Sequence, residues 1–418
     1  MATGSSIAPP KRAIVLSGGG ARGAYEAGVL RFLVEEFPKR SGLSVNFDIV
    51  SGTSVGAIHA CFLAATAELG SERGQLLTNI WDDLRVDEVF RFGSADLIAL
   101  PRKILGARRL ARQLKAGRRP DRLFGLLDTK PLEQLVLKSI PWKNIRPNLK
   151  AGRIEAVCVA ATQIATGRAV VFVERADRSL PPWADQQHIR MQSISLMPIH
   201  ALASAAIPLL FPAVRVGARY YADGGLRLNT PLAPAVRLGA NRILVIGLSY
   251  SATTDIDEGL AQQRTASFGN PMFLFGKILN ALLLSPIDAD IQRMRFINHF
   301  IDCGGVAYGD KFLEKLNQAS IDKNGRPIQK IHDLVIRPSA DLGRMASEVL
   351  ASGDLELSTF MRMFLKPPRD GVHTGESDLL SYLLFDTQYA RPLADLGYRD
   401  AEAKMDELVT FFSDEPID

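Results

Sequence analysis

The chain has few of the residues that build metal centres and disulfide frameworks. Its 418 residues include three cysteines and six histidines. No two cysteines form a C-x-x-C pair and no H-E-x-x-H motif is present, so the sequence predicts neither a zinc site nor any other metal site. No cofactor is expected either. Cys61, Cys158 and Cys303 lie in apolar surroundings and are predicted to be reduced, buried thiols.

Long hydrophobic runs are also missing, although hydrophobic residues make up 47% of the chain. A membrane-spanning helix needs roughly 20 apolar residues. The best candidate, residues 272–284, is interrupted by Gly276, Lys277 and Asn280. Residues 1–12 lack the apolar segment of a secretory signal and are predicted to form a flexible tail. The expected location is the cytoplasm, with peripheral membrane contact left open.

Acidic residues are scarce in one segment. Residues 102–122 contain nine Lys or Arg and one acid, Asp121, and therefore carry +8, whereas the whole chain carries +5 and the remainder −3. Within residues 101–116 the apolar side chains gather on one helical face. Such a helix can lie on an anionic membrane surface or pack on the core, and both interpretations stay open. Nucleic-acid binding is not expected, because no basic module interleaved with aromatic residues is present.

The order of predicted elements indicates an α/β fold. An apolar strand at residues 13–17 precedes a helix at 25–37, and a second strand at 47–51 precedes a helix at 57–67. This β-α-β-α order favours a mostly parallel sheet covered by helices. Further strands are predicted at 154–162, 169–173, 214–216, 219–222, 242–249 and 333–337, and further helices at 342–350, 379–389 and 400–412.

The first glycine motif, S-G-G-G-A-R-G over residues 17–23, is ambiguous. Gly18, Gly20 and Gly23 have the spacing of a dinucleotide-binding fingerprint, but glycine amides at a helix start can also hold an oxyanion that forms during catalysis. A dinucleotide fold needs an acidic residue about 20 positions later, at the end of the second strand. That strand ends instead in Ser51-Gly52-Thr53-Ser54. Nucleotide binding is therefore the weaker interpretation of the motif.

The second glycine motif, G-T-S-V-G, contains the candidate nucleophile. Gly52 and Gly56 flank Ser54 between an apolar strand and an apolar helix. This context predicts a sharp strand-to-helix turn that exposes the serine hydroxyl at a helix N-terminus. By itself the pentapeptide is weak evidence for a nucleophilic serine, since loops are rich in glycine and serine. Its position between a strand and a helix favours a nucleophile.

No histidine is placed to activate this serine. His59 lies five residues after Ser54, on the opposite side of a helix that would present it, and the other histidines stand outside any motif. A carboxylate can accept the proton instead. Asp223 ends a predicted strand and is followed by Gly224 and Gly225, which allow close backbone approach. Taken alone, however, Asp-Gly-Gly is more typical of a turn.

These three motifs, in this order, resemble the patatin-like phospholipase family. The stretches ALASAAIPLLFPAV, residues 201–214, and NTPLAPAVRLGANRILVIGLS, residues 229–249, support the resemblance, which covers residues 13–249. It implies a three-layer fold and hydrolysis of lipid acyl esters through an acyl-enzyme. Its implied site comprises Ser54 as nucleophile, Asp223 as base, the amides of Gly18, Gly19 and Gly20 as oxyanion hole, Arg22 as substrate-binding residue, and the motif-supporting residues Gly23, Gly52, Gly56, Gly224 and Gly225.

The expected organisation is a catalytic domain with additions. Residues 13–250 form the patatin-like domain, with a basic insertion at about 82–130, and residues 251–418 form a mainly helical C-terminal extension packed on it. The expected activity is that of a lipid acyl hydrolase of the phospholipase A or lysophospholipase type. A non-catalytic lipid- or partner-binding protein on the same scaffold is the alternative. The expected partners are a lipid substrate and an anionic membrane surface, and no oligomeric state is predicted.

Overall fold

A computed structural model describes residues 10–91, 112–183, 188–250, 287–324, 327–352 and 378–414, together with residues 274, 276–278, 280 and 281. Residues 1–9 of the predicted flexible tail and residues 102–111 of the basic segment lie outside these described residues, whereas Arg12, expected in the tail, begins the first strand. Among the described residues, none of the helices has the length and apolar character needed to cross a membrane.

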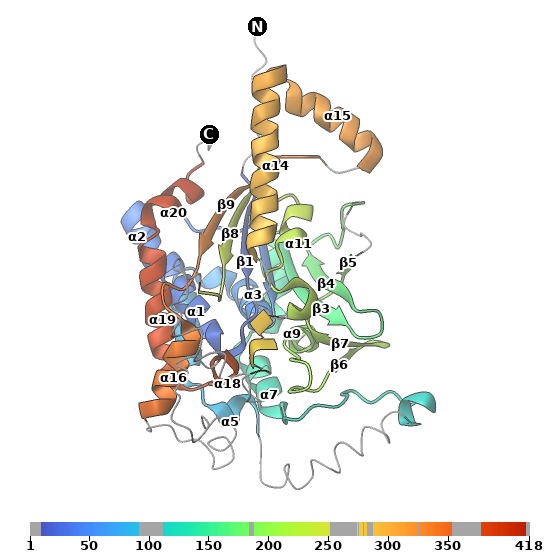
Figure 1. Ribbon diagram of the computed structural model, residues 1–418, viewed down its shortest axis with the longest axis vertical. Coiled ribbons are helices and arrows are strands. Elements are labelled where there is room, and N and C mark those ends of the chain that lie inside the picture. The colour runs from blue at the N-terminus through green and yellow to red at the C-terminus, as the bar shows by residue number, and fades with distance from the viewer. Residues whose placement is uncertain are drawn as a thin grey trace.

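One mixed sheet, mostly parallel, forms the centre of the fold (Figure 1). Its strand order is β5-β4-β3-β2-β1-β8-β9, and β7 pairs with both β3 and β6. The pairs formed by β1, β2, β3, β8 and β9 along this order are parallel, whereas the β3–β4, β3–β7 and β6–β7 pairs are antiparallel. The strands are β1 (Arg12–Leu16), β2 (Ile49–Thr53), β3 (Ala156–Gln163), β4 (Arg168–Arg175), β5 (Ile189–Ser193), β6 (Val214–Val216), β7 (Arg219–Asp223), β8 (Arg242–Ile246) and β9 (His332–Ile336).

Helices cover both faces of the sheet, which produces the expected three layers. Strands β2, β3 and β8 are buried along their whole length, as parallel strands between two helical layers must be. One core cluster joins the sheet to α1 (Gly23–Arg31), α2 (Phe37–Ser41), α3 (Val55–Ala65), α4 (Glu72–Asp83), α7 (Lys130–Ser139), α8 (Ile145–Lys150), α9 (Pro198–Ser204), α16 (Leu342–Ser352), α18 (Asp378–Leu383), α19 (Thr387–Glu402) and α20 (Met405–Phe412). A second cluster joins the opposite face to α10 (Gly225–Leu228), α11 (Leu232–Arg237) and α14 (Ile287–Tyr308). The remaining helices of the described chain include α5 (Val86–Val89) and α15 (Phe312–Asn324).

Residues beyond 250 contribute directly to this architecture. Strand β9 extends the sheet next to β8, and α19 packs closely on α1 (Figure 1). The two helices approach through glycines, because a Cβ at Gly28 would lie 1.8 Å from Ala394 O and one at Gly397 would lie 2.1 Å from Tyr25 O. The strand predicted at residues 333–337 is present, shifted by one residue.

Two expectations about these later residues are wrong. The helix predicted over 379–389 is interrupted after Leu383, because the Asp386 side chain accepts a hydrogen bond from Gln388 N and caps a new helix, α19. Cys303 lies exposed on α14, whereas Cys61 and Cys158 are buried as predicted. The apolar surroundings of Cys303 in the sequence belong to a helix that is largely exposed.

Candidate active site

Ser54 occupies a strained turn between β2 and α3. Its backbone has φ 55° and ψ −123°, a left-handed conformation that costs a non-glycine residue of order 1–3 kcal/mol. The flanking glycines make the turn sterically feasible. A Cβ at Gly52 would lie 2.1 Å from Gly56 O, and one at Gly56 would lie 2.4 Å from Leu16 O. The predicted strand-to-helix turn is thus present, with Ser54 at the N-terminus of α3.

Ser54 and Asp223 are brought together from positions 169 residues apart in the chain. Ser54 Oγ donates a hydrogen bond of 2.7 Å to Asp223 Oδ2. Asp223 is the last residue of β7, opposite Ala161 of β3. Its second oxygen, Oδ1, accepts a hydrogen bond of 2.7 Å from Gly225 N. Gly224 is needed at this bend, because a Cβ there would lie 2.3 Å from Ala160 O.

The electrostatics of Asp223 suit a base. Its side chain is buried, with 1% of the residue exposed. Burial raises the pKa of Asp223 to about 6, and the hydrogen bonds from Ser54 and Gly225 oppose that rise. At neutral pH the group is therefore mainly a carboxylate, yet it is far more basic than an exposed aspartate. Its oxygen can accept the Ser54 proton directly.

The glycine loop lies beside the serine. A Cβ at Gly18 would lie 3.1 Å from Ser54 Cβ. The N–H of Gly18 donates to Asn229 O at 3.2 Å, so this amide is already used within the fold. The amides of Gly19 and Gly20 have no hydrogen-bond acceptor among the residues that the structure describes. The Gly18 amide, expected in the oxyanion hole, is thus engaged within the fold, which leaves the amides of Gly19 and Gly20 as the candidate donors.

Two supporting residues were not identified individually from the sequence. Ser204 Oγ accepts a hydrogen bond of 2.8 Å from Ser54 N and donates to Ala160 O. Asn229 accepts from Gly18 N and donates through Nδ2 to Gly18 O at 3.3 Å. Both lie in the two stretches that carry the family resemblance beyond the three motifs. Those stretches therefore contained the signal, but nothing in them indicates which atom each residue contacts.

Hydroxyl groups at the ends of two strands connect the site to residues 228–231. Thr53 Oγ1 donates to Leu228 O at 2.7 Å, and Ser51 Oγ donates to Pro231 O at 3.0 Å. Ser17 Oγ shares a hydrogen bond of 2.9 Å with Thr230 Oγ1. All three hydroxyl groups are buried. They hold the carboxyl ends of β1 and β2 against the segment that follows Asp223.

His59 is held in a closed polar cluster away from Ser54. Trp81 Nε1 donates to His59 Nε2 at 3.1 Å, and His59 Nδ1 lies 2.8 Å from Glu26 Oε2. An indole N–H can only donate, so Nε2 must carry a lone pair and Nδ1 the proton. Burial lowers the pKa of His59 to about 3, which keeps it neutral. The prediction that His59 does not serve Ser54 agrees with these contacts.

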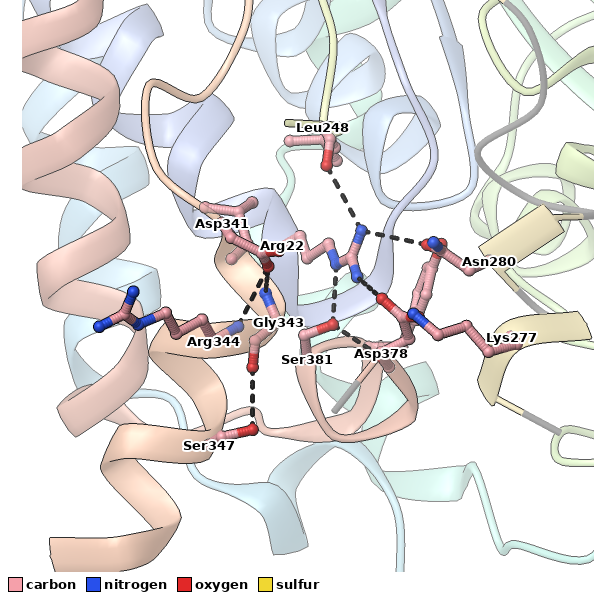
Figure 2. A network of polar contacts seen from close by, with 12 residues as sticks. Arg22, Leu248, Lys277, Asn280, Asp341, Gly343, Arg344, Ser347, Asp378 and Ser381 are labelled. Atoms are coloured by element: carbon pink, nitrogen blue, oxygen red, sulfur yellow. Dashed lines mark hydrogen bonds and ion pairs between the residues drawn. The ribbon is translucent and has the colours of Figure 1, made fainter. Parts of the chain in front are cut away.

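Arg22 points to the C-terminal part of the chain (Figure 2). Its guanidinium group donates to Ser381 Oγ at 2.8 Å, pairs with Asp378 at 3.3 Å and lies 4.5 Å from the centre of the Tyr382 ring. It is buried, with 4% of the residue exposed. Its Nη1 donates to Leu248 O and to Asn280 Oδ1, each at 3.5 Å. The guanidinium donors are thus engaged within the fold, and the expected role of Arg22 in binding a substrate phosphate or the oxyanion stays a prediction.

A cavity of about 420 Å³ lies beside Arg22, lined also by Leu248, Lys277, Asn280 and Asp378. Figure 2 shows several of these side chains converging from separate segments. Lys277 Nζ pairs with Asp378 Oδ2 at 2.7 Å, so Asp378 is shared between two cations. In the described part of the chain, His, Cys, Asp and Glu residues form no group of three that could hold a metal ion.

Known proteins resemble this chain in sequence and, more weakly, in structure. The sequence matches the family described as patatin-like phospholipase over residues 14–236. It is 28% identical over 335 residues to the cGAMP-activated phospholipase of Pseudomonas aeruginosa (strain BWHPSA011 / Pa011), which covers 75% of this chain and 84% of that protein. The crystal structure of VipD from Legionella pneumophila aligns with a TM-score of 0.34 and 15% identity, over 96% of this chain and 67% of VipD. The ExoU–SpcU complex of P. aeruginosa aligns with a TM-score of 0.29 and 19% identity, over 86% of this chain and 66% of that chain.

The family match spans more than half of the chain and contains every predicted site residue. It begins within β1 and ends within α11, so the glycine loop, the Ser54 turn and the end of β7 all fall inside it. The resemblance predicted from the three motifs is confirmed, as is the mostly parallel α/β fold. The chain belongs to the patatin-like phospholipase family and is a lipid ester hydrolase.

Proposed function

We propose that this enzyme cleaves the acyl esters of phospholipids or lysophospholipids through a Ser54–Asp223 dyad. The observation that carries the proposal is the 2.7 Å hydrogen bond from Ser54 Oγ to Asp223 Oδ2, formed at a strained turn beside a glycine loop. A serine hydroxyl is a weak nucleophile until a base removes its proton. A buried carboxylate with a raised pKa is a suitable base at neutral pH.

In the first step the ester carbonyl carbon is attacked by Ser54 Oγ while Asp223 accepts the hydroxyl proton. The carbonyl oxygen becomes an oxyanion, which the amides of Gly19 and Gly20 stabilise. Loss of one such donor typically costs on the order of 10²–10³ in rate. Collapse of the tetrahedral intermediate breaks the ester bond. The leaving alcohol takes the proton from Asp223, and the acyl group remains on Ser54.

In the second step water releases the acyl group. Asp223 takes a proton from the water as its oxygen attacks the acyl carbonyl, and the same amides stabilise the second oxyanion. Collapse returns the proton to Ser54 Oγ and frees the fatty acid. The dyad, the amides and water together account for every proton transferred and every bond formed or broken in the two steps.

Arg22 receives a different role in this proposal from the one expected. Its contacts with Ser381, Asp378 and Tyr382 hold the glycine loop to α18. The loop and α18 also meet at Gly20, where a Cβ would lie 2.3 Å from Tyr382 O. Gly20 has φ +58°, a conformation that favours glycine. Arg22 thus positions the Gly20 backbone and does not contact the lipid.

In this proposal the enzyme reaches its substrate by peripheral contact with an anionic membrane.

The direct test is labelling with a serine-reactive fluorophosphonate probe, combined with mass spectrometry of products from mixed phospholipid vesicles. The wild type is expected to be labelled at Ser54 and to release fatty acid. Ser54→Ala should lose both signals, while Ser71→Ala, which removes an exposed serine hydroxyl, should keep both. A folded Ser54→Ala protein that still hydrolyses lipid would contradict the dyad. A wild type that binds vesicles but takes no label would favour the non-catalytic alternative.

A further inference from the structure

Arginines from neighbouring strands gather at one edge of the sheet, close to Asp223. Arg168 of β4 pairs in register with Gln163 of β3, which pairs in turn with Tyr221 of β7. Arg219 lies two residues before Tyr221, so the two side chains point to the same side of the sheet. Asp223 follows Arg219 by four residues, about 13 Å along the strand. This edge is therefore near the dyad.

Further contacts connect additional arginines to this edge. Arg190 of β5 pairs in register with Val170 of β4, two residues after Arg168, so it lies on the same side of the sheet as Arg168. The charges of Arg219 and Arg190 oppose the rise that burial causes in the pKa of Tyr221. Arg227 reaches the turn between β3 and β4, where a Cβ at Gly167 would lie 3.3 Å from its Nη2. We call the exposed or half-buried set Arg168, Arg190, Arg215, Arg219 and Arg227 the basic rim.

The described part of the basic segment continues the rim. Tyr220 Oη donates to Pro120 O at 2.7 Å, and Arg122 forms a β-bridge with Val214 of β6. Residues 112–122 add five Lys or Arg to the five of the rim, against one acid, Asp121, which pairs with Arg215. Ten basic residues thus lie on adjoining segments at this edge, against two acidic partners, Asp121 and Glu133 of α7, the second of which pairs with Arg122 at 2.9 Å.

Two exposed apolar side chains lie on segments that adjoin the rim. Ile164, in the turn between β3 and β4, is 46% exposed, and its N–H donates to Tyr220 O. Leu209 is 59% exposed and has a left-handed backbone, with φ 68°. It follows Ala206, whose carbonyl accepts a hydrogen bond from Asp223 N, by three residues. Leu209 therefore presents a large apolar side chain to solvent from strained backbone, in the segment that leads into β6.

We propose that the basic rim, with Ile164 and Leu209, docks the enzyme on an anionic lipid bilayer. This inference rests on the proposed function and names the surface through which the dyad meets its substrate. Basic side chains attract the anionic leaflet, and apolar tips beside them enter the interface between headgroups and acyl chains. A nucleic acid would use the charges but would gain little from Ile164 and Leu209.

The arrangement of the fold agrees with this orientation. Figure 1 shows β6 and β7 on the right, toward the same end of the molecule as α18. Helix α18 packs on the glycine loop, at the end of the sheet where β1 runs into that loop. Helices α16 and α19 lie on the opposite side, on the left of the view. Docking through the rim would therefore bring the strand ends that carry the dyad toward the bilayer.

The experiment measures binding of the full chain to phosphatidylcholine vesicles with and without about one third phosphatidylglycerol. The triple variant Arg168→Gln, Arg190→Gln and Arg219→Gln is expected to bind the anionic vesicles about 100-fold more weakly, since each basic residue near the surface contributes roughly fivefold. Its hydrolysis of a soluble short-chain ester should be unchanged. Raising the salt from about 0.05 M to about 0.5 M should weaken wild-type binding strongly.

The matched control removes the same charge from the other side of the molecule. Arg344→Gln, Arg391→Gln and Arg399→Gln change exposed residues of α16 and α19. This control should bind anionic vesicles like the wild type. Equal losses in both triple variants would overturn the proposal, because they would indicate a general charge effect.

A further variant tests the apolar contribution. Leu209→Asn keeps a residue that tolerates positive φ and removes the apolar tip. It should weaken vesicle binding about tenfold at both low and high salt. Fluorescence anisotropy with a DNA duplex provides the last comparison, and binding to the duplex but not to vesicles would overturn the proposal. Vesicle binding that depends on the rim, in a protein that releases no fatty acid, would support the docking surface while refuting the proposed hydrolysis.

Discussion

Two buried carboxylates in this enzyme contact the same helix and differ in what they can do. Asp223 accepts a hydrogen bond from Ser54, at the N-terminus of α3, and Glu26 contacts His59, further along that helix. Burial raises the pKa of both carboxyl groups. The partner of Asp223 is a hydroxyl that can attack a carbonyl. The partner of Glu26 has its second nitrogen occupied by Trp81.

The difference shows that residue type does not identify the base. A serine hydrolase is usually expected to use histidine, and His59 is the histidine nearest to Ser54 in the sequence. Its proton position is fixed by Trp81 and Glu26, and its low pKa leaves it neutral. Asp223 instead has one oxygen held by Gly225 and the other directed at the proposed nucleophile. This contrast supports the proposed role of Asp223 as the base, because its partner is a hydroxyl group that no second contact occupies in the described part of the chain.

The largest expected effect comes from breaking the Ser54–Asp223 pair. Asp223→Asn keeps the shape of the side chain but cannot accept the Ser54 proton, so kcat should fall by about 10²–10⁴. The KM should change little. Ester hydrolysis assays measure both constants, and circular dichroism checks the fold. Asp177→Asn, at an exposed loop carboxylate, serves as control and should retain full activity. Full activity of a folded Asp223→Asn protein would show that Asp223 is not the base.

The pH dependence of the rate gives the next effect. Only the carboxylate form of Asp223 can accept a proton, and its pKa is about 6. The value of kcat/KM should therefore rise roughly tenfold per pH unit below 6 and level off above it. His59, with a pKa of about 3, should contribute no step in this range. A profile that is flat between pH 5 and 7 would contradict the assignment.

The same aspartate should reduce stability at neutral pH. Its pKa is about 6 in the folded state, and its ordinary value of 3.8 applies to the unfolded state. Between pH 3.8 and pH 6 the folded state therefore binds more protons than the unfolded state. Stability contributed by this group therefore falls as pH rises from about 4 to about 6, by roughly 3 kcal/mol in total. Urea unfolding should find Asp223→Asn more stable than the wild type at pH 7.5. The gain should disappear near pH 4, and a gain that does not depend on pH would exclude this cause.

Disturbing the Glu26–His59 pair should lower stability and change hydrolysis little, which is the opposite of the result expected for Asp223→Asn. Trp81→Phe removes the only donor to His59 Nε2 among the described residues and leaves a buried acceptor unsatisfied. The expected cost is about 1–3 kcal/mol of unfolding free energy, with hydrolysis within about tenfold of the wild type. Trp142→Phe, which removes an indole bond to Val136 O at a partly buried site, is the matched control. Loss of hydrolysis in a folded Trp81→Phe protein would contradict this distinction, in which Asp223 serves the reaction and Glu26 serves only the structure.

Local sequence was sufficient to predict the candidate pair. Gly52 and Gly56 are required because a Cβ at either position would lie 2.1–2.4 Å from a backbone oxygen, and Gly224 is required at the bend after Asp223 for the same reason. These constraints act between neighbours in sequence or on adjacent strands. They therefore appear as short motifs, and three motifs in order carried the family resemblance that implied the fold and the proposed dyad.

The partners of the glycine loop could not be predicted in the same way. Gly18 is bonded to Asn229 and Arg22 to Ser381, which are 211 and 359 residues away. No spacing rule connects such positions, because the contacts depend on how α18 and the segment after Asp223 pack on the sheet. For this reason neither the bond that engages the Gly18 amide nor the contacts of Arg22 with α18 could be predicted.

The smallest expected effect concerns a third carboxylate, Asp378, whose partners are two cations rather than a hydroxyl or an imidazole. Asp378→Asn removes its charge and weakens the hold of α18 on Arg22, so the Gly20 amide should be less well placed. We expect kcat to fall less than about tenfold, with no change in the pKa of about 6 expected for Asp223 in the rate profile. Glu348→Gln, which breaks the exposed Arg344–Glu348 pair, should alter neither quantity, since exposed pairs contribute little. A shift of the rate profile in Asp378→Asn would mean that this carboxylate acts on Asp223 electrostatically and not by positioning the loop.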